Sequence, residues 1–272
     1  MDAAPGRHRA GRIPRLLQPV RAAASPPGQR RRRAPDRGGP GPGASRGVAR
    51  APLPRLFFCH SVLHNPTGTT LSPEVARRVL ALAERHDLWI VEDDIYADFQ
   101  QTATPRLAAL DGLRRVLYVG SFSKTLSCSL RVGFIAAPPA LVRPLVDVKM
   151  LSNIASSPFA EQVVATLLRN GSYRRLVDRL RPRLSRRMST ALELAREGGW
   201  EPYAMPRGGM SLWLRHPAVA SSRELVAGAG RRGIRLSPGD VFLPEANDSP
   251  WIRLNVAYVD DARARAFLGD PR

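Results

Sequence analysis

Short apolar runs alternate with amphipathic stretches between residues 56 and 137. The runs are rich in branched or aromatic side chains, which is typical of buried strands. The expected strands are residues 56–62, 88–91, 116–119 and 131–137. Between the first two, Ser72-Pro73-Glu74 has an N-cap residue, a proline and an acid in the order that opens helices. This alternation predicts an α/β domain with a mostly parallel sheet and helices on both of its faces.

After Pro138 the apolar spacing becomes mainly helical. We expect helices at residues 141–151, 158–169 and 173–197, and the last of these is rich in arginine. Pro182 lies inside the third helix. We expect it to kink or interrupt that helix, because proline lacks the amide hydrogen that a helix interior uses.

The last third of the chain mixes both patterns and predicts a second, smaller α+β domain. Its expected strands are residues 210–214, 234–236 and 251–256, and its expected helices are residues 222–231 and 260–268. The predicted divisions are a tail (1–53), a large domain (54–170) and a C-terminal small domain (171–272).

The first 55 residues differ sharply from the rest in composition. They hold 10 Pro, 8 Gly and no aromatic residue, and 13 Arg stand against 2 Asp. Such a segment cannot bury enough apolar surface to offset its ordering entropy, so we expect a disordered tail. The run Arg30–Arg33 could contact phosphates, and any nucleic-acid binding is therefore expected to be weak, nonspecific and confined to this tail.

The net charge of +19 is concentrated in that tail, since the rest of the chain carries 29 basic and 21 acidic groups. Only two of the basic residues are lysines, Lys124 and Lys149. No apolar run approaches the roughly 18 to 20 residues of a membrane-spanning helix. Cys59 and Cys128 are too few for a disulfide framework, so we expect a cytoplasmic protein, and no metal site is expected.

Polar side chains follow the carboxyl ends of three expected strands. Asn65 follows the first strand, Asp93 the second, and Ser121 to Lys124 the third. In open α/β sheets ligands bind at this edge. Taken singly, each residue has an ordinary explanation as a turn, a helix cap or a surface lysine. Their joint order favours a site that brings together an amide, a carboxylate, two hydroxyls and an amine.

These residues resemble a known family, the fold type I pyridoxal-phosphate (PLP) aminotransferases of class I/II. The matching motifs are Asn65-Pro66-Thr67-Gly68, Asp93-x-x-Tyr96, Ser121-Phe122-Ser123-Lys124 and Leu130-Arg131-Val132-Gly133. The sequence of residues 60–70, 92–99 and 118–137 looks closer still to the aminotransferase-like domain of MocR/GntR-type transcriptional regulators. Residues 206–210 and 251–255 resemble that family's C-terminal domain, so the resemblance covers about residues 54–268.

The resemblance implies that PLP is the cofactor and assigns catalytic roles to two residues. Lys124 would hold the cofactor aldehyde as a Schiff base and later carry a proton. Asp93 would face the pyridine nitrogen and keep it protonated, which makes the ring an electron sink. Tyr96 and Asn65 would hydrogen-bond the phenolic oxygen of the ring.

The resemblance also implies two anion-binding groups. Ser121, Ser123 and Arg131 would hold the cofactor phosphate, where arginine offers planar bidentate donors. Ser123 could instead cap the following helix. Arg253 matches the arginine that pairs with the α-carboxylate of the substrate.

The chain departs from the family pattern upstream of Asn65. There the family has a phosphate-binding loop and an aromatic residue that stacks on the cofactor, whereas this chain has the basic tail, so we expect weaker cofactor binding. No winged-helix pattern is found in residues 1–55. Ser129 stands where the family usually has glycine.

Three other features are given structural explanations. Lys149 is expected on the surface, and His64 in a packing or loop role. The string 228–233 fits GxGxxG, but it follows a helix and precedes a strand, which is the reverse of the nucleotide-binding order.

Three functions remain open from the sequence. The first is a PLP-dependent aminotransferase that acts on an α-amino acid and a 2-oxo acid, expected to be a homodimer. The second is the PLP- or amino-acid-sensing effector domain of a MocR/GntR-type regulator without its winged-helix domain. The third is a cofactor-free remnant or a basic nucleic-acid-binding protein.

Overall fold

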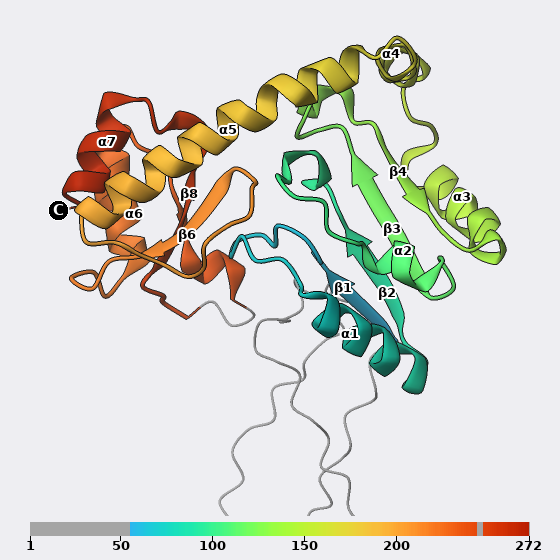
Figure 1. Cartoon of the computed structure of the whole chain (residues 1–272). Helices are drawn as coiled ribbons and strands as arrows, with labels where there is room; N and C mark the ends of the chain where they lie inside the picture. Colours follow the sequence, from blue (N-terminus) through green and yellow to red (C-terminus); the bar gives the residue numbers. More distant parts are fainter. Residues whose placement is uncertain (1–54, 244–246, 272) are drawn as a thin grey trace, which may run out of the picture.

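The computed structural model describes residues 55–243 and 247–271, which form two four-stranded sheets with helices around them (Figure 1). The tail predicted to be disordered, residues 1–53, lies outside the described residues. The α/β fold expected for the large domain is confirmed, whereas the exact domain boundaries stay a prediction. No helix in the described part of the chain is both long and apolar enough to cross a membrane.

The first sheet carries the three polar strand ends that the sequence singled out. Its strands are β1 (Leu56–Cys59), β2 (Trp89–Asp93), β3 (Val116–Ser121) and β4 (Gly133–Ala136). They lie in the order β1-β2-β3-β4, with the first three parallel and β4 antiparallel. The carboxyl ends of β1, β2 and β3 therefore meet at one edge.

Two helices cover one face of this sheet through a common apolar cluster. α1 (Pro73–Arg85) begins as predicted, because the Ser72 hydroxyl accepts from the amide of Val75 at 3.2 Å. α2 (Leu107–Asp111) follows β2. Val79 of α1 packs in this cluster with the fully buried side chains of Ile90 and Val116.

The second sheet is antiparallel and belongs to the C-terminal third. Its strands are β5 (Glu201–Pro202), β6 (Ser211–Arg215), β7 (Ser237–Pro238) and β8 (Trp251–Asn255), in the order β5-β6-β8-β7. The helices beside it are α6 (Ser222–Arg231) and α7 (Ala262–Gly269). The predicted strand at residues 234–236 is wrong. In this segment only Ser237 and Pro238 pair with β8, and residues 234–236 are not part of a strand.

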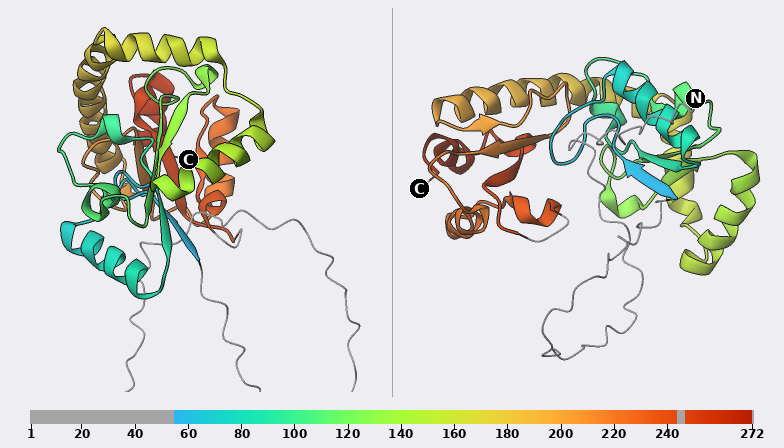
Figure 2. Two further views of the ribbon diagram at one scale, coloured as in Figure 1. Left: turned by 90° about the vertical axis from the view of Figure 1, so that its right-hand side faces the viewer. Right: turned by 90° about the horizontal axis from the view of Figure 1, so that it is seen from below.

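Helix α5 (Ser172–Glu197) links the two sheets. Leu184 packs near the first sheet in a cluster with Val62 and Phe99, whereas Met188 packs in the core of the second sheet. Figures 1 and 2 show α5 as one long helix that runs past both sheets. The helix continues through Pro182 and is not interrupted there, because tertiary packing on both sides of the proline holds the turns together.

Two further helices, α3 (Pro139–Asn153) and α4 (Pro158–Arg169), precede α5. The pattern at residues 141–151 predicts an amphipathic helix, yet no residue of α3 is buried. Leu151 is 89% exposed. Lys149 lies on the surface as expected, with its ammonium 3.9 Å from Oε1 of Glu161.

The described residues also contain short 3-10 helices. They are η2 (Ala97–Phe99), η3 (Cys128–Leu130), η4 (Gly239–Phe242) and η5 (Val256–Tyr258).

Candidate active site

The carboxyl edge of the first sheet gathers the predicted cofactor residues. Asp93 ends β2 and Ser121 ends the parallel strand β3, so both lie at the same edge. Asn65 lies in the turn that follows β1, and Lys124 lies three residues beyond Ser121. Parallel pairing thus brings together side chains that are far apart in the sequence.

Lys124 and Tyr96 face each other across this edge. The Lys124 ammonium lies 6.0 Å from the centroid of the Tyr96 ring. Lys124 is exposed and has no hydrogen-bond or ion-pair partner within residues 55–243 and 247–271, whereas the Tyr96 ring is buried. Burial raises the pKa of the Tyr96 phenol; the charge of Arg253 opposes this rise and that of Asp93 adds to it. Arg253 and Asp93 thus both act electrostatically on the Tyr96 phenol.

Asp93 is oriented by the turn that follows β2 and by a histidine. Its Oδ1 accepts from the amide of Ile95 at 3.1 Å, and its Oδ2 lies 3.7 Å from Nε2 of His60. His60 is 9% exposed, and its Nδ1 has no hydrogen-bond partner among the described residues. The sequence analysis missed His60. The sequence places His60 inside the expected strand 56–62, whereas β1 ends at Cys59 and leaves His60 at the edge of the sheet.

Arg253 of β8 reaches from the second sheet to the first. Its Nη1 donates to Oδ1 of Asn65 at 2.8 Å, and its Nη2 donates to the hydroxyl of Ser237 at 3.1 Å. The guanidinium lies 5.1 Å from the centroid of the Phe242 ring. Both hydrogen-bond acceptors are neutral, so the charge of Arg253 has no carboxylate partner within the described chain. Ser237 is a second residue that sequence reasoning missed.

Ser121, Ser123 and Arg131 lie together at the end of β3. The hydroxyl of Ser121 accepts from the amide of Ser123 at 3.2 Å. The amide of Phe122 donates to the carbonyl of Val132 at 3.1 Å, which brings the neighbouring Arg131 back to this segment. Arg131 has a left-handed backbone (φ +52°) and an exposed side chain that has no partner in the part of the chain described.

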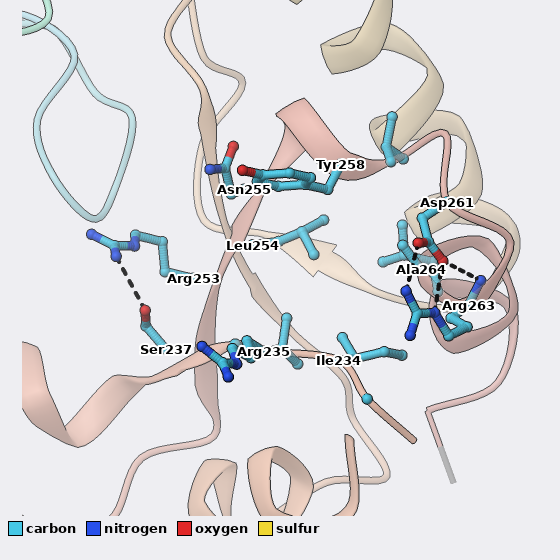
Figure 3. A pocket seen from close by; sticks show the side chains of 14 residues that line it. Ile234, Arg235, Ser237, Arg253, Leu254, Asn255, Tyr258, Asp261, Arg263 and Ala264 are labelled. Atoms are coloured by element: carbon cyan, nitrogen blue, oxygen red, sulfur yellow. Dashed lines mark hydrogen bonds and ion pairs between the residues drawn. The ribbon is translucent and has the colours of Figure 1, made fainter. Parts of the chain in front are cut away.

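A hollow of about 460 Å³ lies beside Arg253, between residues 233–237 and the β8–α7 region. Figure 3 shows the Arg253–Ser237 bond at one side of the hollow and the Asp261–Arg263 ion pair (2.9 Å) at the other. Among the predicted site residues only Arg253 lines this hollow. The hollow is therefore distinct from the edge where Lys124 and Tyr96 lie.

Fold and site together define the class: an α/β protein with an accessible lysine, a carboxylate and a buried tyrosine at one edge of a mostly parallel sheet. Comparison with protein families gives the narrower assignment. The family model "Aminotransferase class I and II" matches residues 44–269, and the chain belongs to this family.

The relatives include both enzymes and regulators. The chain is 32% identical over 210 residues to the uncharacterised HTH-type transcriptional regulator YdfD of Bacillus subtilis, a match that covers 75% of this chain and 42% of the regulator. It is 28% identical over 218 residues to aromatic-amino-acid aminotransferase 1 of Thermococcus litoralis, covering 78% of this chain and 52% of the enzyme. The chain thus spans about half the length of these curated relatives.

Solved structures support the fold and the cofactor. The structure of Pyrococcus horikoshii kynurenine aminotransferase, determined with PMP, superposes with a TM-score of 0.73 at 26% identity. The match covers 79% of this chain and 54% of that one. The family match and such neighbours indicate pyridoxal 5'-phosphate as the cofactor, as the sequence predicted.

The described residues fit that cofactor on their own geometry. The Lys124 amine is accessible and unpaired in the described chain, as condensation with an aldehyde requires. The Asp93 side chain is 35% exposed, which leaves it open to a ligand. Neither Arg253 nor Arg131 has a carboxylate partner among the described residues, so both guanidinium charges are open to an anionic ligand.

Proposed function

We propose that this protein is a PLP-dependent aminotransferase acting on an α-amino acid. In the overall reaction the amino acid gives up its amino group and becomes a 2-oxo acid, and a second 2-oxo acid receives that group. PLP supplies an aldehyde that condenses with amines and a ring that takes up the electrons of the broken Cα–H bond. The observation that carries this proposal is the convergence of Lys124, Asp93 and Tyr96 at one sheet edge.

Lys124 is proposed as the residue that binds the cofactor and moves a proton. Its amine would hold the cofactor through the aldehyde carbon, and when free it would carry the proton that leaves the substrate Cα. The Asp93 carboxylate is proposed to face the ring nitrogen and hold a proton there. The nearby His60 Nε2 limits the positions that this carboxylate adopts.

Asn65 and Tyr96 are proposed to donate to the phenolic oxygen of the ring. The Arg253 guanidinium has only donors, so Asn65 must turn its Oδ1 towards it. The Nδ2 of Asn65 then remains as a donor for the cofactor. Burial raises the pKa of the Tyr96 phenol, which therefore keeps its proton at neutral pH.

Charged ends of the ligands are proposed to bind at two places. Ser121, Ser123 and Arg131 hold the cofactor phosphate, and Arg253 pairs with the α-carboxylate of the amino acid. Because Arg253 lies on the second sheet, the substrate bridges the two sheets. We also propose that the protein is cytoplasmic and forms a homodimer, and sedimentation velocity tests the dimer directly.

The deciding experiment adds PLP to the purified chain and records the visible Schiff-base absorbance. We expect the wild type to show this absorbance and the Lys124→Ala variant to lack it. Lys149→Ala is the matched control, since it removes the only other lysine, and it is expected to retain the absorbance. A wild type without absorbance, or a Lys124→Ala variant that retains it, contradicts the proposal.

A second function is favoured by one specific observation, the 32% identity to an HTH-type regulator. In that case the same site senses PLP or an amino acid with little turnover. Release of 2-oxo acid from a panel of amino acids separates the two functions. Turnover indicates the enzyme, whereas Schiff-base absorbance without turnover indicates the effector domain.

A further inference from the structure

Tyr173 in the first turn of α5 contacts two segments that belong to the candidate active site. Its hydroxyl bonds to the Asp98 carboxylate and lies 2.9 Å from the hydroxyl of Thr125. Thr125 directly follows Lys124 and is buried, and Asp98 lies two residues after Tyr96 within η2. A single phenol thus joins the lysine loop to the tyrosine segment.

The direction of these hydrogen bonds follows from the groups involved. An ionised carboxylate only accepts, so the Tyr173 O–H donates to Asp98. The phenol has one proton, and Thr125 must therefore donate its hydroxyl proton to the Tyr173 oxygen. The other acceptor near Thr125, the Phe122 carbonyl, lies at the longer distance of 3.5 Å. The result is a directed chain from Thr125 through Tyr173 to Asp98.

Neighbouring contacts hold the phenol in place. Phe122 of the lysine loop packs edge-on against the Tyr173 ring, with centroids 5.4 Å apart and an interplanar angle of 81°. Further along α5, Nε of Arg181 donates to the Asp98 carbonyl at 2.7 Å. Burial and the hydrogen bond to Asp98 raise the pKa of Tyr173, which therefore stays a proton donor at neutral pH.

We propose that Tyr173 is a positioning residue that fixes the Lys124 loop relative to Tyr96. It acts through Thr125 on the loop that presents the amine, and through Asp98 on the segment that presents the Tyr96 ring. This role rests on the proposed function, because a defined Lys124–Tyr96 geometry matters only if both groups contact a ligand.

The first test measures amide hydrogen exchange in the cofactor-free protein. In Tyr173→Phe the ring contact with Phe122 is kept and the hydroxyl is lost, so exchange in residues 122–129 is expected to be about five- to tenfold faster. Tyr203→Phe is the control, because it removes a phenol hydroxyl with no hydrogen-bond partner in the described residues. Unchanged exchange in residues 122–129 of Tyr173→Phe overturns the proposal.

The second test measures the PLP dissociation constant and the pH titration of the Schiff-base absorbance. Tyr173→Phe is expected to bind PLP about tenfold more weakly and to shift the titration, while Tyr203→Phe matches the wild type. Faster exchange with an unchanged dissociation constant and titration overturns the positioning role. If the wild type takes up no PLP, the proposed function fails and the positioning role falls with it, whereas the exchange data still show whether the hydroxyl holds the loop.

A double-mutant cycle shows whether the effect passes through Thr125. Thr125→Val keeps the shape of the side chain and removes its hydroxyl. If the two hydroxyls act as one unit, the variant with both changes loses about as much PLP affinity as Tyr173→Phe alone. Fully additive losses overturn the proposed path.

Discussion

Arg253 and Asn65, which are 188 residues apart in the sequence, are joined by a hydrogen bond of 2.8 Å from Nη1 to Oδ1. The bond links the second sheet to the turn after β1. It also directs the Asn65 amide, so that in the proposed function one contact would set both the donor for the cofactor and the cation for the substrate.

Arg253→Lys is expected to raise the KM for the amino acid about 10- to 100-fold. Lysine keeps the charge, but it lacks the planar fork that binds a carboxylate through two donors. Steady-state kinetics of the PLP-loaded protein measure the effect. Arg235→Lys serves as the control, since Arg235 lines the neighbouring hollow without reaching Asn65. Equal effects in both variants would assign carboxylate binding to the hollow.

His64 is expected to make stability depend on pH below neutrality. Burial, with the charge of His60, lowers the pKa of His64 from 6.5 to about 4. As the pH falls through 6.5, His64 of the unfolded chain takes up a proton. His64 of the folded protein does not take up this proton until about pH 4. The free energy of unfolding therefore decreases between these two pH values. Urea denaturation at pH 7 and pH 5 should show a smaller difference in His64→Gln than in the wild type. His86→Gln, which changes an exposed histidine, is the control. If the stability difference between pH 7 and pH 5 is the same in His64→Gln as in the wild type, the prediction is refuted.

Glu92→Ala is expected to lower the free energy of unfolding by about 3 kcal/mol. Glu92 is fully buried, and its carboxylate accepts from the amides of Leu107 and Ala108 at 2.8 Å each and from the hydroxyl of Ser61. The alanine variant leaves these donors unpaired. Urea denaturation gives the value, with the exposed first-turn residue Glu74 changed to alanine as the control. A loss no larger than that of Glu74→Ala would contradict this account.

Pro182→Ala is expected to stabilise the protein by about 1 to 2 kcal/mol. The proline is exposed inside α5, where it removes a hydrogen bond and crowds the preceding turn. Alanine restores the bond and is the best helix former. The midpoint of urea unfolding should rise, while the exposed neighbour Arg183 changed to alanine leaves it nearly unchanged. A lower midpoint in Pro182→Ala would show that α5 needs the proline.

The edge of the first sheet was predictable because its signals are local. Each strand is a short apolar run. Asp93 and Ser121 follow two of those runs in the sequence, and they are the last residues of β2 and β3 in the structure. Parallel pairing then requires them to meet. Residues 234–236 show the limit of the same method, since an apolar pair around Arg235 resembles a strand but forms no strand pairing with β8.

The contacts that tune the site were not predictable, because they depend on how distant elements pack. His60 matters only because β1 pairs with β2 and brings it to Asp93. Tyr173 matters only because α5 begins beside the lysine loop. No pattern along the chain reports such distances. The predicted helix over residues 173–197 is present, and only the possible interruption at Pro182 is excluded.

The pairing of Lys149 with Glu161 has a practical consequence for chemical labelling. In most proteins an amine-reactive reagent modifies a dozen or more side chains and its products are hard to assign. Here only two side-chain amines exist, and one of them is engaged by an acid on the next helix. Labelling with a small excess of an amine-reactive reagent, followed by peptide mass analysis, should therefore show whether the Lys124 amine is shielded.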